Sequence, residues 1–210
     1  MIEYRLSLLG DDAVSIQPSE RKLRHPIART LRDTGQWIDV VPGKDIVVAR
    51  FDPFSLRPSE AIRKMEAWLS MFEAKSAGPN MEVELHLDIS GDYAPDLPEL
   101  AAQNGLSEQA LIEKVMRSAL VVDMLGFTPG FAYVEGVDKA IRAERLATPR
   151  QRVMAGSVGL VSGQLGFYGL AGPGGWPIIG RLREILFDPE RASAFLLQEG
   201  QPVRLCLVQD

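Results

Sequence analysis

Glycine is concentrated in one stretch of this 210-residue chain. Twelve of its 19 glycines lie within residues 126–180, interleaved with arginines and aromatic residues. Glycine gives up more conformational freedom on folding than any other residue, so this concentration predicts unusual backbone angles or close backbone approach. Loops positioned by a rigid scaffold often carry binding residues. We therefore expect the functional site within residues 126–180.

The charge of the chain argues against a polyanionic partner. It carries 23 lysines and arginines against 28 aspartates and glutamates, a net charge of −5, whereas nucleic-acid binders usually present a basic stripe. No apolar run approaches the roughly 20 residues that span a bilayer, and residues 1–6 lack the features of a signal peptide. We expect no nucleic-acid partner, no membrane association and a cytoplasmic location. The single cysteine, Cys206, lies in an apolar run typical of a buried thiol.

The first 80 residues show the periodicities of a small α+β domain. Apolar residues at helical spacing predict helices at 23–33 and from residue 58 to before Gly78. Strand patterns fall at 4–9, 13–16, 37–41 and 46–51. The order ββαββα predicts an α+β sandwich over residues 1–80, with helices on one face of a sheet.

Residues 81–210 have the pattern of a mainly-β domain. A strand is predicted at 82–89, and two short helices follow before residue 120. Asp96 and Glu99 have the spacing of a capping box for the first of these helices. Short strands separated by glycine turns, as predicted beyond that point, are typical of a closed barrel. These strands are expected at 120–124, 131–134, 158–161, 167–170, 178–182 and 203–208.

Several active-site patterns are incomplete. Residues 155–159 fall one residue short of the serine-hydrolase turn G-x-S-x-G, and both histidines precede Ser157, so we exclude a catalytic triad. No phosphate-binding G-x-x-x-x-G-K-[ST] motif is present, so the sequence does not announce an ATP site. His86 would share a strand face with Glu84 and Asp88, where a solvated face competes with a metal site. We assign no metal.

Two arginines in the glycine-rich stretch have the spacing of an anion site. Arg150 and Arg152 alternate along an extended chain and so would point to the same side. Two guanidinium groups can hold a carboxylate or phosphate through paired hydrogen bonds, and a structural salt bridge is the alternative. Gln164, Tyr168 and Trp176 in neighbouring glycine phrases can add amide, phenol and stacking groups, although core packing is an equal alternative for Trp176.

The glycine-rich phrases together resemble those of a known family. Four segments are similar to allophanate hydrolase subunit 1: Gly-Phe-Thr-Pro-Gly-Phe-Ala-Tyr at 126–133, residues 147–159, residues 163–168, and Pro-Gly-Gly-Trp-Pro-Ile-Ile-Gly-Arg at 173–181. The family is also known as the B subunit of 5-oxoprolinase and includes Kip-type inhibitors of histidine kinases. Shorter matches extend the resemblance over essentially the whole chain, at 40–42, 48–53, 93–97, 186–190 and 195–198.

This resemblance implies a two-domain fold and a place in an enzyme complex. The expected fold is a small α+β sandwich followed by a cyclophilin-like β-barrel over residues 81–210. Family members resemble one half of the carboxyltransferase region of urea amidolyase. In the 5-oxoprolinase complex they help open the lactam of 5-oxoproline to L-glutamate, coupled to ATP hydrolysis. The implied partners are a homologous allophanate hydrolase subunit 2 (the C subunit of 5-oxoprolinase), a LamB/YcsF-type protein (its A subunit), and ATP held with or by one of these partners.

For an amide hydrolase the predicted catalytic residues are Arg150, Arg152 and Gln164. The arginines would hold the substrate carboxylate, while the Gln164 amide and backbone N–H groups at 156–159 would stabilise the developing oxyanion. The residues predicted to bind substrate share the same glycine-rich phrases; they are Phe131, Tyr133, Gly156, Ser157, Tyr168, Gly174, Gly175 and Trp176.

Two alternatives stay open at the level of sequence. Kip-type members bind a sensor histidine kinase, and Phe131, Tyr133 and Trp176 would supply an aromatic groove for that role. The chain also departs from the family pattern, which admits a non-catalytic paralogue of an allophanate hydrolase or urea carboxylase subunit. Val115 stands where relatives often carry histidine, and residues 88–91, 131–132, 135–136 and 164–166 differ from the usual Cys-Tyr-Gly-Gly, Phe-Pro, Gly-Gly and Gln-Thr-Gly.

Overall fold

The computed structural model describes residues 2–73 and 81–208. The chain divides into two compact units, Met1–Gly78 and Pro79–Asp210. Each has its own hydrophobic cluster of buried residues. We therefore describe the units one at a time.

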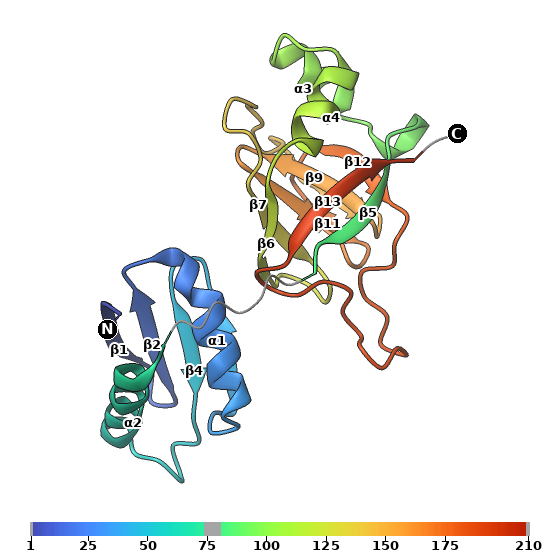
Figure 1. Cartoon of the computed structure of the whole chain (residues 1–210). Helices are drawn as coiled ribbons and strands as arrows, with labels where there is room; N and C mark the ends of the chain where they lie inside the picture. The colour runs from blue at the N-terminus through green and yellow to red at the C-terminus, as the bar shows by residue number, and fades with distance from the viewer. Residues whose placement is uncertain (1, 74–80, 209–210) are drawn as a thin grey trace. The chain divides into compact units, whose positions relative to one another are not determined.

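The first unit is a four-stranded antiparallel sheet with two helices (Figure 1). The strands are β1 (Tyr4–Leu9), β2 (Ala13–Pro18), β3 (Asp39–Pro42) and β4 (Val47–Arg50), in the order β1-β2-β4-β3. The short 3₁₀ turn η1 (Arg21–Leu23) leads into α1 (Arg24–Asp33), and α2 (Pro58–Met71) ends the unit's regular structure.

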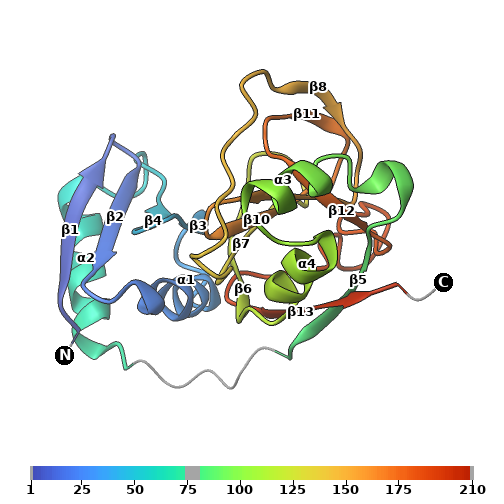
Figure 2. The same ribbon diagram turned by 90° about the horizontal axis from the view of Figure 1, so that it is seen from above.

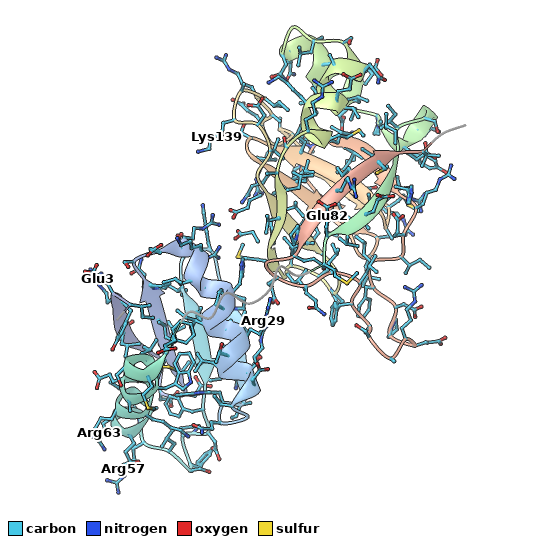
Figure 3. The ribbon with its side chains drawn as sticks, in the orientation of Figure 1. Glu3, Arg29, Arg57, Arg63, Glu82 and Lys139 are labelled. Atoms are coloured by element: carbon cyan, nitrogen blue, oxygen red, sulfur yellow. The ribbon has the colours of Figure 1, made fainter. Side chains whose placement is uncertain are left out.

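One face of this sheet forms the first core with both helices. Alternate residues of β2, Val14 and Ile16, are fully buried and belong to the same cluster as Leu31 of α1 and Met65 of α2. Because neighbouring strand residues point to opposite faces, this alternation places both helices against one face of the sheet. Charged residues of the unit, such as Arg57 and Arg63, extend from its surface (Figure 3).

The second unit is built on a closed barrel of seven strands. Their order around the barrel is β10-β7-β6-β13-β5-β12-β9, and the β5–β13 pair is parallel. The strands are β5 (Val83–Asp88), β6 (Leu120–Leu125), β7 (Ala132–Glu135), β9 (Ser157–Val161), β10 (Gln164–Phe167), β12 (Ile178–Leu182) and β13 (Pro202–Leu207). Two further short strands, β8 (Arg150–Val153) and β11 (Gly172–Gly174), pair only with each other.

Helices α3 (Leu97–Gln103) and α4 (Glu108–Met116) lie at one end of the barrel (Figures 1 and 2), and the 3₁₀ turn η2 (Gly91–Tyr93) precedes them. Their inward residues, including Leu100 and Ile112, join the same cluster as the barrel residues Leu85 and Leu165. The barrel interior is thus packed with side chains rather than open. The β8–β11 pair stands apart from the barrel strands (Figure 2).

The structure confirms a mixed α/β chain with a closed barrel and corrects two local predictions. The strand predicted at 167–170 is instead Gln164–Phe167, because Gly163, with φ +83°, turns the chain directly into β10. The capping box predicted at Asp96 does not form, because that carboxylate is bonded to other elements. Within the described ranges, no helix is long and apolar enough to cross a membrane.

Candidate functional site

Four of the aromatic residues predicted to bind substrate form a packed cluster beside the barrel. The Phe131 ring lies 4.8 Å from Tyr133, 5.0 Å from Tyr168 and 6.4 Å from Trp176, edge to face in each case. Phe131, Tyr168 and Trp176 are only 3%, 2% and 6% exposed. Such pairs stabilise a core beyond the area they bury. Phe131 and Trp176, two of the three residues predicted to line an open aromatic groove in a kinase inhibitor, are therefore buried, and the third, Tyr133, is partly buried.

One cross-strand pair of glycines lies in close contact with these rings. Gly159 and Gly166 face each other across β9 and β10. A β-carbon on Gly159 would lie 2.8 Å from Trp176 Cβ, and one on Gly166 would lie 2.8 Å from Phe131 Cζ. Both positions thus need glycine for close packing, which explains part of the glycine concentration.

Tyr168 is buried among these groups as a neutral phenol. Burial raises the pKa of Tyr168, and this effect outweighs a hydrogen bond from the backbone N–H of Trp176 and the positive charges of Arg145 and Arg150. Gly174 lies against the phenol, so any β-carbon there would collide with the hydroxyl oxygen. The two predicted site residues Tyr168 and Gly174 therefore pack against each other.

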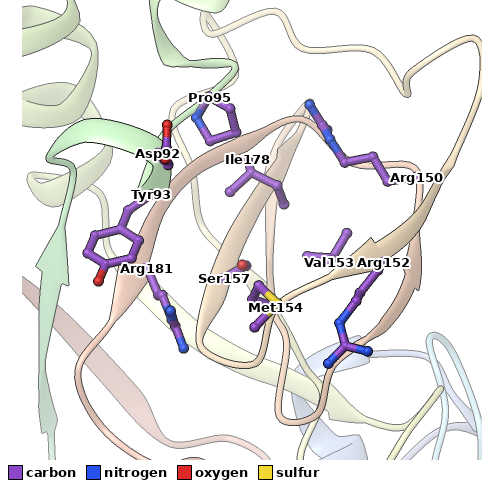
Figure 4. A pocket seen from close by; sticks show the side chains of 10 residues that line it. All are labelled: Asp92, Tyr93, Pro95, Arg150, Arg152, Val153, Met154, Ser157, Ile178 and Arg181. Carbon is purple, nitrogen blue, oxygen red and sulfur yellow. The ribbon is translucent and has the colours of Figure 1, made fainter.

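A pocket of about 240 Å³ opens where β8, β9 and β12 meet the η2 segment (Figure 4). It combines three arginines and one serine with apolar side chains. It is lined by Asp92, Tyr93, Pro95, Arg150, Arg152, Val153, Met154, Ser157, Ile178 and Arg181. Apolar walls with a few convergent polar groups are the usual form of a small-molecule site. The predicted residues Arg150, Arg152 and Ser157 are brought together here.

Arg150 is already paired. Its guanidinium donates to both carboxylate oxygens of Asp96, at 2.7 and 2.9 Å. The same carboxylate accepts the backbone N–H of Ile178 at 2.6 Å. The paired arginines expected from sequence are therefore not equivalent, and Arg150 makes the structural salt bridge that was the alternative. Figure 4 shows its guanidinium directed toward the Pro95 side, away from Arg152.

Arg152, Ser157 and Arg181 present unused donors to the pocket. Among the described residues, neither the Arg152 side chain nor the Ser157 hydroxyl has a protein hydrogen-bond partner. Arg181 uses one nitrogen, donating from Nε to the carbonyl of Ala155 at 2.9 Å. Figure 4 shows Ser157 between Arg181 and Arg152. This arrangement can bind an anion through charge-assisted hydrogen bonds.

The remaining predicted residues lie elsewhere. Gln164 pairs with Val161, at the far end of β9 from Ser157, so it lies about 13 Å along the strand and does not line the pocket. Gly175 packs against Pro149. The sequence predicted a single site for these residues. In the fold they are divided between a pocket, a buried aromatic cluster and the end of a hairpin.

The oxyanion donors predicted at 156–159 are partly occupied. The backbone N–H of Gly156 donates to the Tyr168 carbonyl at 2.7 Å, and that of Ser157 donates to the Met154 carbonyl at 3.2 Å. Neither group is free to receive a substrate oxygen in this conformation. The side-chain hydroxyl of Ser157 is the donor that this segment offers to the pocket.

The acidic and imidazole groups on β5 are engaged in hydrogen bonds with neighbouring residues. His86 Nδ1 lies 2.7 Å from Glu184 Oε1, and the Glu184 carboxylate also accepts the His86 backbone N–H at 3.0 and 3.1 Å. Asp88 accepts hydrogen bonds from the hydroxyl and N–H of Ser90. No group of three or more metal-binding side chains was found within the described part of the chain.

Comparison with known proteins places this chain in a family. The family model described as "Carboxyltransferase domain, subdomain C and D" matches residues 4–197. The chain belongs to this carboxyltransferase domain family, which confirms the resemblance seen in its glycine-rich phrases.

Individual relatives are similar to this chain in sequence or in structure over nearly its whole length. The B subunit of 5-oxoprolinase from Escherichia coli O157:H7 is 36% identical over 211 residues, covering 97% of this chain and 96% of the relative. The crystal structure of TTHA0988 superposes with a TM-score of 0.80 at 29% identity; it covers 100% of this chain, which spans 41% of that longer chain. Kluyveromyces lactis urea carboxylase has the same fold, with a TM-score of 0.71 at 16% identity over 99% of this chain and 22% of its own.

Sequence reasoning missed most of the pocket lining and the residue that fixes Arg150. Arg181 and Tyr93 line the pocket, and Asp96 holds Arg150 at its edge. The Arg181 guanidinium lies 5.4 Å from the Tyr93 ring. Both Arg181 and Tyr93 stood in phrases that carried the family resemblance, but their closeness depends on strand pairing, which no local pattern reveals.

Proposed function

We propose that this chain is one component of an ATP-dependent amide hydrolase complex of the 5-oxoprolinase type, which converts 5-oxoproline and ATP to L-glutamate. The observation that carries the proposal is end-to-end similarity to the B subunit of Escherichia coli 5-oxoprolinase, with 36% identity over 97% of this chain. The proposed partners are the homologous C subunit of 5-oxoprolinase and its LamB/YcsF-type A subunit. A cyclophilin-like barrel and a cytoplasmic location stay predictions.

The pocket supports a small substrate rather than a nucleotide. Its volume of about 240 Å³ lies below the roughly 300–1,000 Å³ that drug-sized ligands occupy. A five-membered lactam with one carboxylate belongs to this smaller class, whereas ATP does not. We therefore assign ATP to a site formed with or by one of the partner proteins.

The proposed roles differ among the predicted catalytic residues. Arg152 is one candidate for contacting the substrate carboxylate, because it lines the pocket and has no ion pair with any described residue. Arg150 supports the pocket wall through Asp96. Gln164 lies outside the pocket and receives no role in the proposal.

Reconstitution tests the function. Mixed with the LamB/YcsF-type protein and the homologous C subunit, the chain is expected to give ATP-dependent release of glutamate from 5-oxoproline, measured by a coupled glutamate assay. Omission of this chain or of ATP should abolish the release. A complete mixture that hydrolyses ATP without forming glutamate would contradict the proposed substrate.

Substitution at Arg152 tests the site in the same assay. Arg152→Ala is expected to lower kcat/KM by about 10- to 100-fold, the range of one hydrogen bond to a charged group. Gln151→Ala is the matched control, because Gln151 is an exposed neighbour on β8 that does not line the pocket. Equal kcat/KM values for the two variants would remove Arg152 from the site.

A further inference from the structure

We infer that Arg181 is the principal anion-binding group of this pocket, and that the pocket takes a small monocarboxylate held by Arg181, the Ser157 hydroxyl and Arg152. The inference rests on the proposed function for the identity of the substrate and deepens it by naming the group that binds the carboxylate. It starts from strand pairing, which brings these side chains together.

Strand pairing brings Arg181 beside Ser157. The two residues face each other across β12 and β9. Directly opposed residues of an antiparallel pair lie on the same face, with Cβ atoms about 4.5–5.5 Å apart. Both line the pocket. Ser157 is 6% exposed and, among the described residues, its hydroxyl has no protein partner, so that hydroxyl is available to a ligand bound at Arg181.

Two contacts hold the Arg181 side chain in place, and a glycine leaves room for it. Its Nε–H donates to the Ala155 carbonyl at 2.9 Å, and its guanidinium stacks 5.4 Å from the Tyr93 ring. Gly156, with φ +84°, leaves room for the stem, since a β-carbon there would lie 3.3 Å from Arg181 Cγ and 2.9 Å from the Leu182 carbonyl oxygen. The terminal nitrogens make no hydrogen bond with the described residues. The group is thus fixed in position with its two terminal nitrogens unused, the preorganisation that binding favours.

The charged residues around the pocket leave a net positive charge that one anionic group can neutralise. Arg150 is compensated by Asp96. Asp88, which also faces Arg181 across the sheet, is bonded to Ser90 and lies 3.5 Å from Arg183. The charges left are those of Arg152 and Arg181 against Asp92. One net positive charge matches a monocarboxylate better than a dianion such as a phosphate ester.

The other walls fit the remainder of such a ligand. Val153 and Ile178 are buried apolar residues, and Met154 adds a flexible apolar surface. A small apolar ring can therefore contact these residues while its carboxylate reaches the arginines. The pocket thus separates a charged end from an apolar end.

Calorimetric titration of the full chain tests this assignment directly. The probes are 5-oxoproline and 2-pyrrolidinone, which is the same lactam ring without the carboxylate. We expect 5-oxoproline to bind the unmodified chain about 10- to 100-fold more tightly than 2-pyrrolidinone, and Arg181→Met to remove that difference. Arg142→Met is the matched control, because Arg142 is an exposed arginine of the same unit that does not line the pocket; it should leave both affinities within about twofold.

Glycine variants test how Arg181 is held. Gly156→Ala and Gly163→Ala impose similar backbone strain, with φ of +84° and +83°, but only Gly156 lies against Arg181. Gly156→Ala is expected to weaken 5-oxoproline binding at least about tenfold, while Gly163→Ala lowers thermal stability alone. Equal losses of affinity in both variants would contradict the positioning role.

The outcomes separate this inference from the proposed function. If another small monocarboxylate, such as cyclopentanecarboxylate, binds with the same dependence on Arg181 while 5-oxoproline does not, the pocket assignment holds and the lactam substrate fails. If the reconstituted complex forms glutamate and Arg181→Met binds 5-oxoproline like the unmodified chain, the proposed function holds and this inference is wrong. Binding of no monocarboxylate by the folded chain also overturns it.

Discussion

At the scale of single residues, packing decides what several glycines do. Gly159 and Gly166 have ordinary backbone angles, yet a β-carbon on either would press on Trp176 or Phe131. Gly156 is different, since its positive φ and its closeness to Arg181 both favour glycine. A sequence shows the glycines but does not distinguish these two causes.

Gly166→Ala is expected to destabilise the chain by about 1–3 kcal/mol, because the added methyl group overpacks a well-filled cluster. Its β-carbon would lie 2.8 Å from Phe131 Cζ. Gly172→Ala should change the free energy of unfolding by no more than about 0.5 kcal/mol, since nothing lies within 4 Å of the new β-carbon. Urea unfolding followed by tryptophan fluorescence measures both values, and equal midpoints would show that the cluster can relax.

The buried phenol of Tyr168 is expected to make the free energy of unfolding depend on pH in the alkaline range. Because burial raises the pKa of its phenol, the unfolded chain loses this proton first, from about pH 10 upward. Stability that is fully present below that pH is therefore lost as pH rises toward the folded pKa. Tyr168→Phe should make the decline above pH 10 shallower, and parallel curves for variant and parent would exclude this contribution.

At the scale of secondary-structure elements, Asp96 joins three of them. Asp96 precedes α3, and its carboxylate binds Arg150 of β8 and the N–H of Ile178 at the start of β12. The backbone N–H of Asp96 also donates to the Ile178 carbonyl. The pocket wall at this point is therefore fixed by one half-buried residue that precedes helix α3.

Asp96→Asn is expected to cost about 1–3 kcal/mol, because it weakens the Arg150 pair and leaves a poorer acceptor for the Ile178 N–H. Asp92→Asn is the matched control, an exposed aspartate four positions earlier with no ion pair to the described residues. Thermal unfolding compares the two. A loss in the Asp92 variant as large as that in Asp96→Asn would point to net charge as the cause.

At the scale of the whole molecule, the described residues of each unit form their own main hydrophobic core. The cluster that includes Met65 draws only on the first unit, and the cluster that includes Leu165 draws only on the second. Separate cores predict separate cooperative transitions, because each unit buries its own apolar surface.

Met65→Ala is expected to lower the free energy of unfolding of the first unit by about 2–5 kcal/mol. Calorimetry should then show one transition at a lower temperature and the other unchanged. Met65 is fully buried, whereas Met71 on the same helix is 76% exposed. Met71→Ala should therefore shift neither transition by more than about 0.5 kcal/mol. A single transition that moves as a whole in Met65→Ala would show that the units unfold together.

Much of the fold could be predicted from local pattern. Helical spacing placed α1 and α2, and strict alternation placed β5, because periodicity is set by backbone geometry. The strand at 167–170 was displaced because Gly163 starts β10 earlier. The short strand β11 gave no strand signal, since its two glycines and its proline carry weak strand propensity. Its partner β8 was expected only as an extended segment.

By itself the sequence determined the elements, the family and the stretch that carries the pocket, because these depend on periodicity and on phrases read along the chain. The tertiary structure alone decided which arginines are available: Arg150 is bound by Asp96, 54 residues earlier, and Arg181 lies opposite Ser157 across paired strands. The physical reason is that a side chain's partners are set by strand register and barrel closure, which join residues far apart in the sequence.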